Sequence, residues 1–366
     1  MKSFRGLLCF LVVLLAPSVV FGNAGTALMW ASELHMLLGN ILLGILEGLL
    51  LAKFFKVSKK RAIGFLIVAN YFSAWLGMEF FVDYLNRSIE LTIENLRYWL
   101  RVFMWVAFGV TLVVEFPFFW WVLRKLEHSF AKAVKATILL HCISYALLLF
   151  WYGKASDTSM ITDLEIVPAE TLVPEEKYVL YYLSNDGKSV QRMMLDGVSK
   201  AEHFAEVTAL DDNDRLFVRS SGNARFDLFL HLDLGYQTKE VEIEQAFADL
   251  AAIDPRMKRR ESHQVEGTWY NFGVVASLAS DSDWKYFVGF WPSSGIHGWR
   301  KEENQDVYYG LETPISEWSV RNAIHLEGNY LLFQLGKDQI CLLHPDSQRI
   351  ALVARGKGPV VSTPKN

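Results

Sequence analysis

The sequence predicts a membrane α-helical bundle of four transmembrane helices, followed by an all-β exported domain that is either β-propeller-like or a β-sandwich. Long apolar runs fill the chain up to Tyr152, and short alternating strand patterns fill residues 176–366. The charge is also divided at Tyr152. The segment before it carries 14 of the 36 Lys and Arg residues but only 8 of the 40 Asp and Glu residues. The front of the chain is therefore basic and apolar, and the back is acidic.

This composition excludes several protein classes. Hydrophobic residues make up 52 % of the chain and the mean hydropathy is +0.18, which is high for a soluble protein. A single soluble globule and a disordered chain are both excluded by the long apolar runs. A nucleic-acid binder is excluded because the large water-compatible part is acidic, whereas a phosphate-binding surface is basic.

The N-terminus has the pattern of a secretory signal peptide, predicted over residues 1–22. Lys2 and Arg5 supply the positive start, and Leu7 to Ala16 form an apolar stretch that Pro17 ends. Ten apolar residues are too few to cross a bilayer, which needs roughly 17 to 25. We expect cleavage before Asn23. The alternative is an uncleaved fifth anchor that extends into residues 17–25.

The four-helix transmembrane domain is predicted over residues 23–152. Its spans are expected at about 28–52, 62–85, 99–123 and 136–152. The first span contains Asn40 and Glu47, yet it also holds twelve Leu or Ile residues. Each of these favours insertion by roughly 0.3 to 0.6 kcal/mol, which outweighs a cost of roughly 2.5 to 3.5 kcal/mol for one central acid. We therefore expect this segment to insert.

Basic residues in the loops predict the orientation. Lysines and Arg61 cluster between the first two spans, and Arg124 begins a second basic cluster between the last two. Such loops stay on the cytoplasmic side. The protein is therefore expected in the cell (inner) membrane as a multi-pass protein. Its C-terminal domain is expected on the extracytoplasmic (periplasmic) side, where a cleaved signal peptide would also place the mature N-terminus.

Each predicted span carries one stripe of small or polar residues at helical spacing, and the stripes are expected to face one another. In the first span, Gly44 and Gly48 form a small-xxx-small pair that allows close helix approach. The intramembrane polar cluster predicted from these stripes consists of Asn40, Glu47, Asn70, Ser73, Glu115, His141 and Ser144. Counting from the span midpoints places both glutamates at a similar depth, with Asn70 and His141 nearby.

Two carboxylates at one depth in hydrocarbon cannot both stay charged without compensation. At least one must be protonated, or the pair must be screened by a charged histidine, a cation or water. This chemistry suits a proton relay, an ion site or a polar ligand pocket. The alternative is structural, because polar side chains also hydrogen-bond between helices to fix their register.

Residues 153–175 are predicted to be a linker, and residues 176–366 an extracytoplasmic β-rich domain. Asp186-Gly187 separates two apolar strand patterns, and residues 330–354 read as a three-strand meander. One helix is expected over Val241–Ala252. Hairpin starts near 178, 215, 286 and 330 come close to the spacing of propeller blades, which favours four or five units, with a β-sandwich as the alternative.

No catalytic motif, cofactor-binding motif or metal-ligand spacing is recognised, so the chain is predicted not to be an enzyme and to need no cofactor and no metal. The first hypothesis is an integral membrane protein whose β-rich domain binds an envelope protein or polymer. The alternative is a small ion- or proton-coupled transporter component that uses the Glu47, Glu115 and His141 cluster. The lipid bilayer is the other expected partner, and no nucleic acid is expected.

Overall fold

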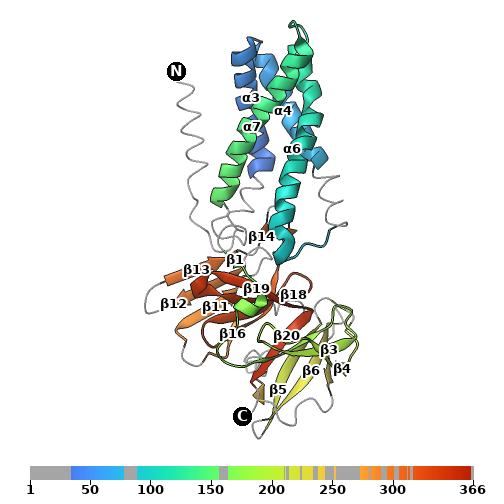
Figure 1. Cartoon of the computed structure of the whole chain (residues 1–366), viewed down its shortest axis with the longest axis vertical. Helices are drawn as coiled ribbons and strands as arrows, with labels where there is room; N and C mark the ends of the chain where they lie inside the picture. Colours follow the sequence, from blue (N-terminus) through green and yellow to red (C-terminus); the bar gives the residue numbers. More distant parts are fainter. Residues whose placement is uncertain are drawn as a thin grey trace. The chain divides into compact units, whose positions relative to one another are not determined.

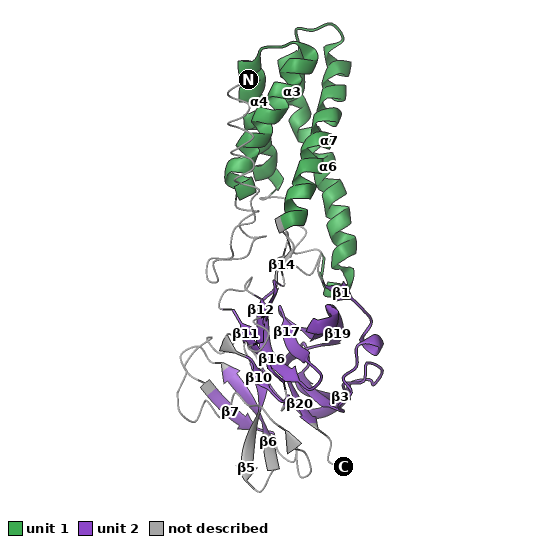
Figure 2. Cartoon of the chain, turned by 90° about the vertical axis from the view of Figure 1, so that its left-hand side faces the viewer, with its two compact units in different colours: residues 1–157 green, residues 158–366 purple. Residues whose placement is uncertain are grey.

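The computed structural model of the chain divides into two compact units, residues 1–157 and 158–366 (Figures 1 and 2). The structure describes residues 34–77, 89–155, 164–209, 211, 214–222, 225–233, 238–243, 251–252, 273–279, 282–289, 295–300, 305–310, 312–313 and 316–363. The predicted signal peptide lies outside these residues, as do residues 28–33 of the first predicted span, 78–85 of the second and 156–163 of the predicted linker.

The first unit is helical. Its described elements are the π-helical turn η1 (His35–Gly39) and the helices α3 (Asn40–Phe55), α4 (Lys59–Leu76), α6 (Ile93–Leu123) and α7 (Ser129–Ala155). Helix α6 begins with a capping box, in which the Thr92 side chain accepts from the Asn95 backbone and the Asn95 side chain accepts from Thr92. This cap starts the helix at Ile93, six residues before the predicted span.

Three helices in the described part of the chain are long and apolar enough to cross a membrane. They cover His35–Phe55 with 21 residues, Ile93–Leu123 with 31 and Ser129–Lys154 with 26. At about 1.5 Å per residue, each reaches the roughly 30 Å thickness of a bilayer core. Helix α4 is not one of them, because its 18 described residues begin with Lys59, Lys60 and Arg61. Membrane-compatible helices are thus present, and the fourth span remains a prediction.

The helical unit exposes large apolar side chains and buries polar ones. Val113 is 74 % exposed and Trp105 is 67 % exposed, whereas Glu47 and Glu115 are each 1 % exposed. A soluble helix bundle has the opposite arrangement, because water stabilises charged side chains at its surface. The exposed apolar surface suits contact with lipid, so the burial pattern agrees with the lengths of the helices.

Helices α3 and α4 pack in close contact through the two predicted glycines. A Cβ added to Gly44 would lie 2.6 Å from Cα of Ile67, and one added to Gly48 would lie 2.6 Å from Cα of Ile63. No side chain fits at such distances without moving the neighbouring backbone. The small-xxx-small pair therefore holds α4 directly against α3.

The second unit is β-rich. Its strands are β1 (Glu165–Ile166), β2 (Val179–Leu183), β3 (Ser189–Met194), β4 (Glu202–Glu206), β5 (Arg215–Gly222), β6 (Arg225–Asp233), β7 (Thr238–Glu242), β8 (Ala251–Ala252), β9 (Gly273–Val274), β10 (Ala276–Ser277), β11 (Trp284–Val288), β12 (Ile296–Arg300), β13 (Gln305–Tyr309), β14 (Glu312–Thr313), β15 (Ser316–Glu317), β16 (Val320–Leu326), β17 (Tyr330–Leu335), β18 (Gln339–His344), β19 (Arg349–Arg355) and β20 (Lys357–Thr363). Within the described residues they form sheets in the orders β1-β19-β18-β17-β16-β10, β13-β12-β11-β9, β14-β15, β4-β3-β2-β20-β8 and β5-β6-β7.

The hairpins predicted from turn chemistry are present. Strands β2 and β3 pair antiparallel around a turn in which Gly187 has a φ of +68°, a conformation that glycine adopts easily. Strands β17, β18 and β19 form the predicted meander. Strand β20, near the C-terminus, pairs with β2. This long-range pairing joins the two ends of the β-rich unit in one sheet.

Strand β2 is buried on both faces because two other sheets pack against its own. Leu180 and Tyr182 belong to a core shared with strands β16 to β18, and Leu332 is one of the residues that they meet there. Val179 and Tyr181 belong to a second core, shared with strands β5 and β6. Alternate side chains of a strand point to opposite faces, so this continuous apolar strand lies between two layers.

The helix predicted over Val241–Ala252 is wrong at both of its ends. Strand β7 runs through Glu242, and Ala251–Ala252 form strand β8. Strand β7 pairs with β6 along its full length, from Thr238 opposite Asp233 to Glu242 opposite Phe229. Hairpin pairing with the preceding strand β6, and pairing of Ala251–Ala252 with the distant strand β20, have overridden the local helical spacing at these ends, because β-structure depends on neighbours more than on local preference. Residues 244–250 of the predicted helix lie outside the described residues.

Candidate functional site

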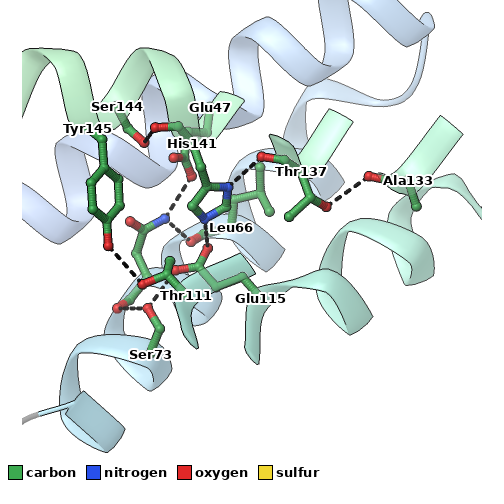
Figure 3. Close-up of polar contacts among 11 residues, drawn as sticks. Glu47, Leu66, Ser73, Thr111, Glu115, Ala133, Thr137, His141, Ser144 and Tyr145 are labelled. Carbon is green, nitrogen blue, oxygen red and sulfur yellow. Dashed lines mark hydrogen bonds and ion pairs between the residues drawn. The ribbon is translucent and has the colours of Figure 1, made fainter. Parts of the chain in front are cut away.

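Buried polar side chains from all four described helices meet inside the helical unit (Figure 3). Those within the helices that have under a tenth of their surface exposed are Asn40, Glu47, Asn70, Glu115, Thr137, His141 and Ser144. Six of these were named from the sequence because they recur at helical spacing. Ser73, the remaining predicted residue, is half-buried. The predicted stripes therefore do face the interior of the bundle.

Glu115 on α6 and His141 on α7 face each other at the centre of the cluster. Nε2 of His141 lies 3.2 Å from Oε2 of Glu115, and Nδ1 of His141 donates to the carbonyl of Thr137 at 2.8 Å. A carbonyl oxygen only accepts, so Nδ1 carries a hydrogen. No other hydrogen-bond partner reaches Nε2 or Oε2 among the described residues. A proton must therefore sit between these two atoms, bound to one or the other.

The second oxygen of Glu115 is held by helix α4. The Ser73 hydroxyl lies 2.5 Å from Oε1 of Glu115 and 3.1 Å from the carbonyl of Asn70. A short hydroxyl–carboxylate contact of this kind is stronger than a bond between neutral groups. Both oxygens of Glu115 thus have a polar neighbour, one on α4 and one on α7.

Glu47 on α3 is held by Asn70 on α4. Nδ2 of Asn70 donates to Oε2 of Glu47 and to the carbonyl of Leu66, both at 2.9 Å. These bonds use both hydrogens of the amide and fix which way it points. Ser144 donates to the carbonyl of His141, one turn back on its own helix, at 3.2 Å.

One predicted residue is separate from this network. Asn40 is 3 % exposed, but its amide donates to the carbonyl of Met36 in the preceding turn of its own helix, at 3.2 Å. It therefore contributes to the local helix instead of bridging helices. The other six predicted residues are linked through the contacts described above, so the site consists of Glu47, Asn70, Ser73, Glu115, His141 and Ser144.

The structure adds one pair of residues that the predicted cluster lacked. The hydroxyls of Thr111 and Tyr145 are hydrogen-bonded at 3.1 Å (Figure 3). Thr111 lies one turn from Glu115 on α6, and Tyr145 lies one turn from His141 on α7. The spacing of four residues was visible in the sequence. A tyrosine in an apolar run, however, reads as an interfacial or lipid-facing aromatic, which is why Tyr145 was missed.

The two sides of the cluster differ in chemistry. One end of the bundle holds the connection 56–58 between α3 and α4 and the connection 124–128 between α6 and α7, and we call it the loop end. Between the cluster and the loop end lies a fully buried apolar core that includes Leu66, Phe119 and Leu140. The Thr137 hydroxyl, on that side, donates to the carbonyl of Ala133 at 2.8 Å. On the opposite side, the next turn holds the Thr111 and Tyr145 hydroxyls.

The charge of the cluster follows from its composition. With His141 protonated and both glutamates ionised, the site has a net charge of −1, and the described residues within it offer no further cation. A net charge buried in an apolar bundle is costly, so the neutral form has one additional proton on a glutamate. No group of three or more His, Cys, Asp or Glu among the described residues could hold a metal ion.

Comparison with known proteins assigns no function to this cluster. No model of a known protein family matches the chain, and no curated protein matches it. The contacts of Glu115 and His141, and the burial around them, therefore determine which chemistry the cluster can perform.

Proposed function

We propose that the chain is a multi-pass membrane protein whose helix bundle binds and exchanges protons at Glu47, Glu115 and His141. The observation that carries this proposal is the 3.2 Å contact between Oε2 of Glu115 and Nε2 of His141. Since Nδ1 of His141 is already a donor, this contact needs a proton that either group can hold. A carboxyl–imidazole pair with one shared proton is a natural proton acceptor and donor.

The same contacts favour a proton over a metal cation as the ion bound here. A metal ion would need several ligands arranged around it at about 2.0 to 2.6 Å. Here the carboxyl and imidazole groups meet at direct hydrogen-bond distance, and Oε1 of Glu115 and Oε2 of Glu47 already accept bonds from Ser73 and Asn70. These contacts leave no space between the two groups for an ion larger than a proton.

We also propose that protons enter from the side opposite the loop end. Beyond the cluster on that side, Thr111 and Tyr145 place two hydroxyls in hydrogen-bond contact, and hydroxyls can both donate and accept. Toward the loop end lie the fully buried apolar side chains of Leu66, Phe119 and Leu140, and the hydroxyl of Thr137 on that side already donates to the carbonyl of Ala133 in its own helix. Access from one side supports a site that responds to the pH of one compartment. Transport across the membrane would additionally require this apolar core to open.

Infrared difference spectroscopy of the purified full-length protein in nanodiscs tests the proton site. Acidification should produce a carboxylic-acid C=O band, and Glu115→Gln should remove or shift it because the shared proton no longer has a carboxyl group to bind. Glu47→Gln should change a second component. Glu127→Gln, at an exposed position in the 124–128 connection, is the matched control and should leave the buried bands unchanged.

Spectra of the Glu47→Gln and Glu115→Gln proteins that superpose on the spectrum of the unmodified protein would refute proton binding at this site.

A second variant tests the side from which protons enter the site. Tyr145→Phe removes one hydroxyl of the Thr111–Tyr145 pair and should slow the appearance of the carboxylic-acid band after a pH jump. Tyr98→Phe, at a position 63 % exposed, should not slow it. Equal rates in the two variants would exclude the Thr111–Tyr145 route.

The proposed topology has four spans, with α4 as the fourth, the loop end cytoplasmic and the β-rich unit extracytoplasmic, after an N-terminal signal peptide. One contact supports it. Arg61, after the first basic connection, donates to the carbonyl of Trp121 at 2.8 Å, just before the second. Both basic connections therefore lie at the same end of the bundle, as expected if they share the cytoplasmic side of a cell (inner) membrane.

We expect a periplasmic reporter enzyme fused after Asn366 to be active, and the same reporter fused within 124–128 to be inactive. The reason is that connections rich in Lys and Arg stay in the cytoplasm during insertion, so the loop end of the bundle is cytoplasmic. Activity assays and protease protection in whole cells measure the two fusions. The reverse pattern would place the β-rich unit in the cytosol and contradict the proposed topology.

A second function is favoured by a separate observation: the β-rich unit acts as a binding module. An open pocket of about 320 Å³ lies on the strands β11 to β13 and is lined by several aromatic side chains. Exposed aromatic surface of this kind marks binding sites more often than it stabilises a monomer.

The packing of the sheets supports the propeller-like arrangement over a two-layer sandwich. The sheet that contains β2 packs against another sheet on each of its faces, and strand β20, near the C-terminus, completes that sheet by pairing with β2.

A further inference from the structure

The sheet that contains β11, β12 and β13 has one buried face and one exposed face. Along β11, Trp284, Tyr286 and Val288 are buried, whereas Lys285 and Phe287 between them are exposed. The same alternation places Gly298 inside and Trp299 outside on β12. Successive side chains of a strand point to opposite faces, so the exposed residues of the three strands share one surface.

The strand register arranges these exposed residues in two parallel rows. In the first row, Lys285 lies opposite Trp299, and Trp299 lies opposite Asp306. In the second row, Phe287 lies opposite His297, and His297 lies opposite Tyr308. We call these six residues the aromatic grid. They line the open pocket of about 320 Å³.

Sheet stability explains only part of the grid. His297 and Tyr308 are in ring contact, with centroids 4.3 Å apart, and such a cross-strand pair stabilises a sheet by roughly 0.2 to 1 kcal/mol. Trp299 is different, because its partners across the strands are Lys285 and Asp306 and 41 % of it is exposed. Phe287, 44 % exposed, leaves a second aromatic face open. Two large aromatic faces in water remain to be explained by a ligand.

The charges of the grid identify what kind of ligand fits. Lys285 and Asp306 flank Trp299 on opposite sides, so the surface has one cation, one anion and no net charge. An anionic ligand would meet Asp306, and a cationic one would meet Lys285. Burial also lowers the pKa of His297, so this side chain is neutral at pH 7 and can donate or accept a hydrogen bond. The complementary ligand is neutral, has an apolar face and carries both donors and acceptors.

We infer that the aromatic grid binds a neutral sugar ring of an oligosaccharide. The C–H face of a pyranose ring is weakly positive and matches the negative face of an indole or phenyl ring. Its hydroxyls donate and accept, so they can bond to Lys285, Asp306 and His297 together. This inference rests on the proposal that the β-rich unit is a binding module, and it assigns the chemical class of its ligand.

The test uses the full-length protein in nanodiscs and a panel of soluble probes: neutral gluco- and N-acetylglucosamine hexasaccharides, a hexuronate of the same length, and unstructured neutral peptides. Isothermal titration gives the affinities. We expect the neutral hexasaccharides to bind, the hexuronate to bind at least tenfold more weakly, and Trp299→Ala and Phe287→Ala each to weaken neutral binding at least tenfold. Trp299→Phe should restore part of the affinity, because it restores an aromatic face.

Val198→Ala is the control, since Val198 is 69 % exposed and lies outside the grid. It should leave binding unchanged. Peptide binding that is lost in Trp299→Ala, with no sugar binding, would overturn the sugar assignment and leave the binding module standing. Tighter binding of the hexuronate would overturn the neutral-ligand assignment. Sugar or peptide binding that none of the grid variants alters would overturn the grid as the site.

Discussion

Replacing His141 alone by leucine should destabilise the helix bundle by about 3–5 kcal/mol, the usual cost of removing one partner from a buried ion pair. The substitution leaves Oε2 of Glu115 facing an apolar side chain, and no other described group is placed to bond to it. Glu115→Met should be destabilising as well, because it leaves Nε2 of His141 without a partner. Unfolding of the purified protein in mixed detergent micelles measures both.

The double variant His141→Leu with Glu115→Met should be far more stable than the sum of the single losses implies. Each single variant leaves one buried polar group without its partner. Replacing both members of the pair by apolar side chains leaves no such group, and replacements of this kind are often neutral or stabilising. We therefore expect a large coupling free energy between the two positions. Effects that simply add would show that the 3.2 Å contact is not an energetic pair.

A matched control cycle is available one turn away on the same two helices. Thr111→Val and Tyr145→Phe remove a single hydroxyl–hydroxyl bond between half-buried groups. Their coupling should be about 1 kcal/mol or less, as is usual for a neutral hydrogen bond. A small coupling here and a large one at Glu115–His141 would set the proton-sharing pair apart from an ordinary neutral hydrogen bond between the same two helices.

The double variant also separates function from folding. If His141→Leu with Glu115→Met inserts and folds, the pair is not needed to build the bundle. Loss of the carboxylic-acid infrared band in that folded protein could then be attributed to the chemistry of the site. This outcome would favour proton binding over the structural alternative, in which polar side chains serve only to align the helices.

The membership of the cluster could be predicted from the sequence, but its internal pairing could not. Helical spacing alone placed Glu115 and His141 on interior stripes, because the period of 3.6 residues decides which side chains share a face. Whether Ser73 reaches Glu115 or Glu47 depends on the rotation and depth of each helix, which are set by packing. Asn40 illustrates the limit: it shares the interior stripe of α3, yet its amide bonds within its own helix.

The β-rich unit shows the same division between local and long-range information. The hairpin around Gly187 was predictable because its turn needs a residue with positive φ. The pairing of β2 with β20 joins strands at opposite ends of the unit, and no local pattern reports it. The helix predicted over Val241–Ala252 is wrong at its two described ends, because Val241–Glu242 pair with the preceding strand β6 and Ala251–Ala252 pair with β20, more than a hundred residues along the chain.

Adding a single methyl group at Gly44 or Gly48 should weaken the bundle, although alanine normally favours a helix over glycine by about 1 kcal/mol. The added Cβ would lie 2.6 Å from the Cα of Ile67 or Ile63, so the two helices must separate. Overpacking of this kind typically costs about 1 to 3 kcal/mol, and occasionally more. The Asn70–Glu47 bond spans the same helix pair and should lengthen as the helices move apart.

Two glycines elsewhere in the bundle provide the matched controls. A Cβ added at Gly64 on α4 or at Gly109 on α6 meets nothing within 4 Å. Gly64→Ala and Gly109→Ala should therefore leave stability unchanged or raise it slightly, through helix preference alone. Gly44→Ala with Gly48→Ala should lower the unfolding midpoint in detergent and alter the Glu47 infrared component. If all four substitutions instead raise stability alike, α3 and α4 are not in close contact, and the positions assigned here to Glu47 and Asn70 would have to be revised.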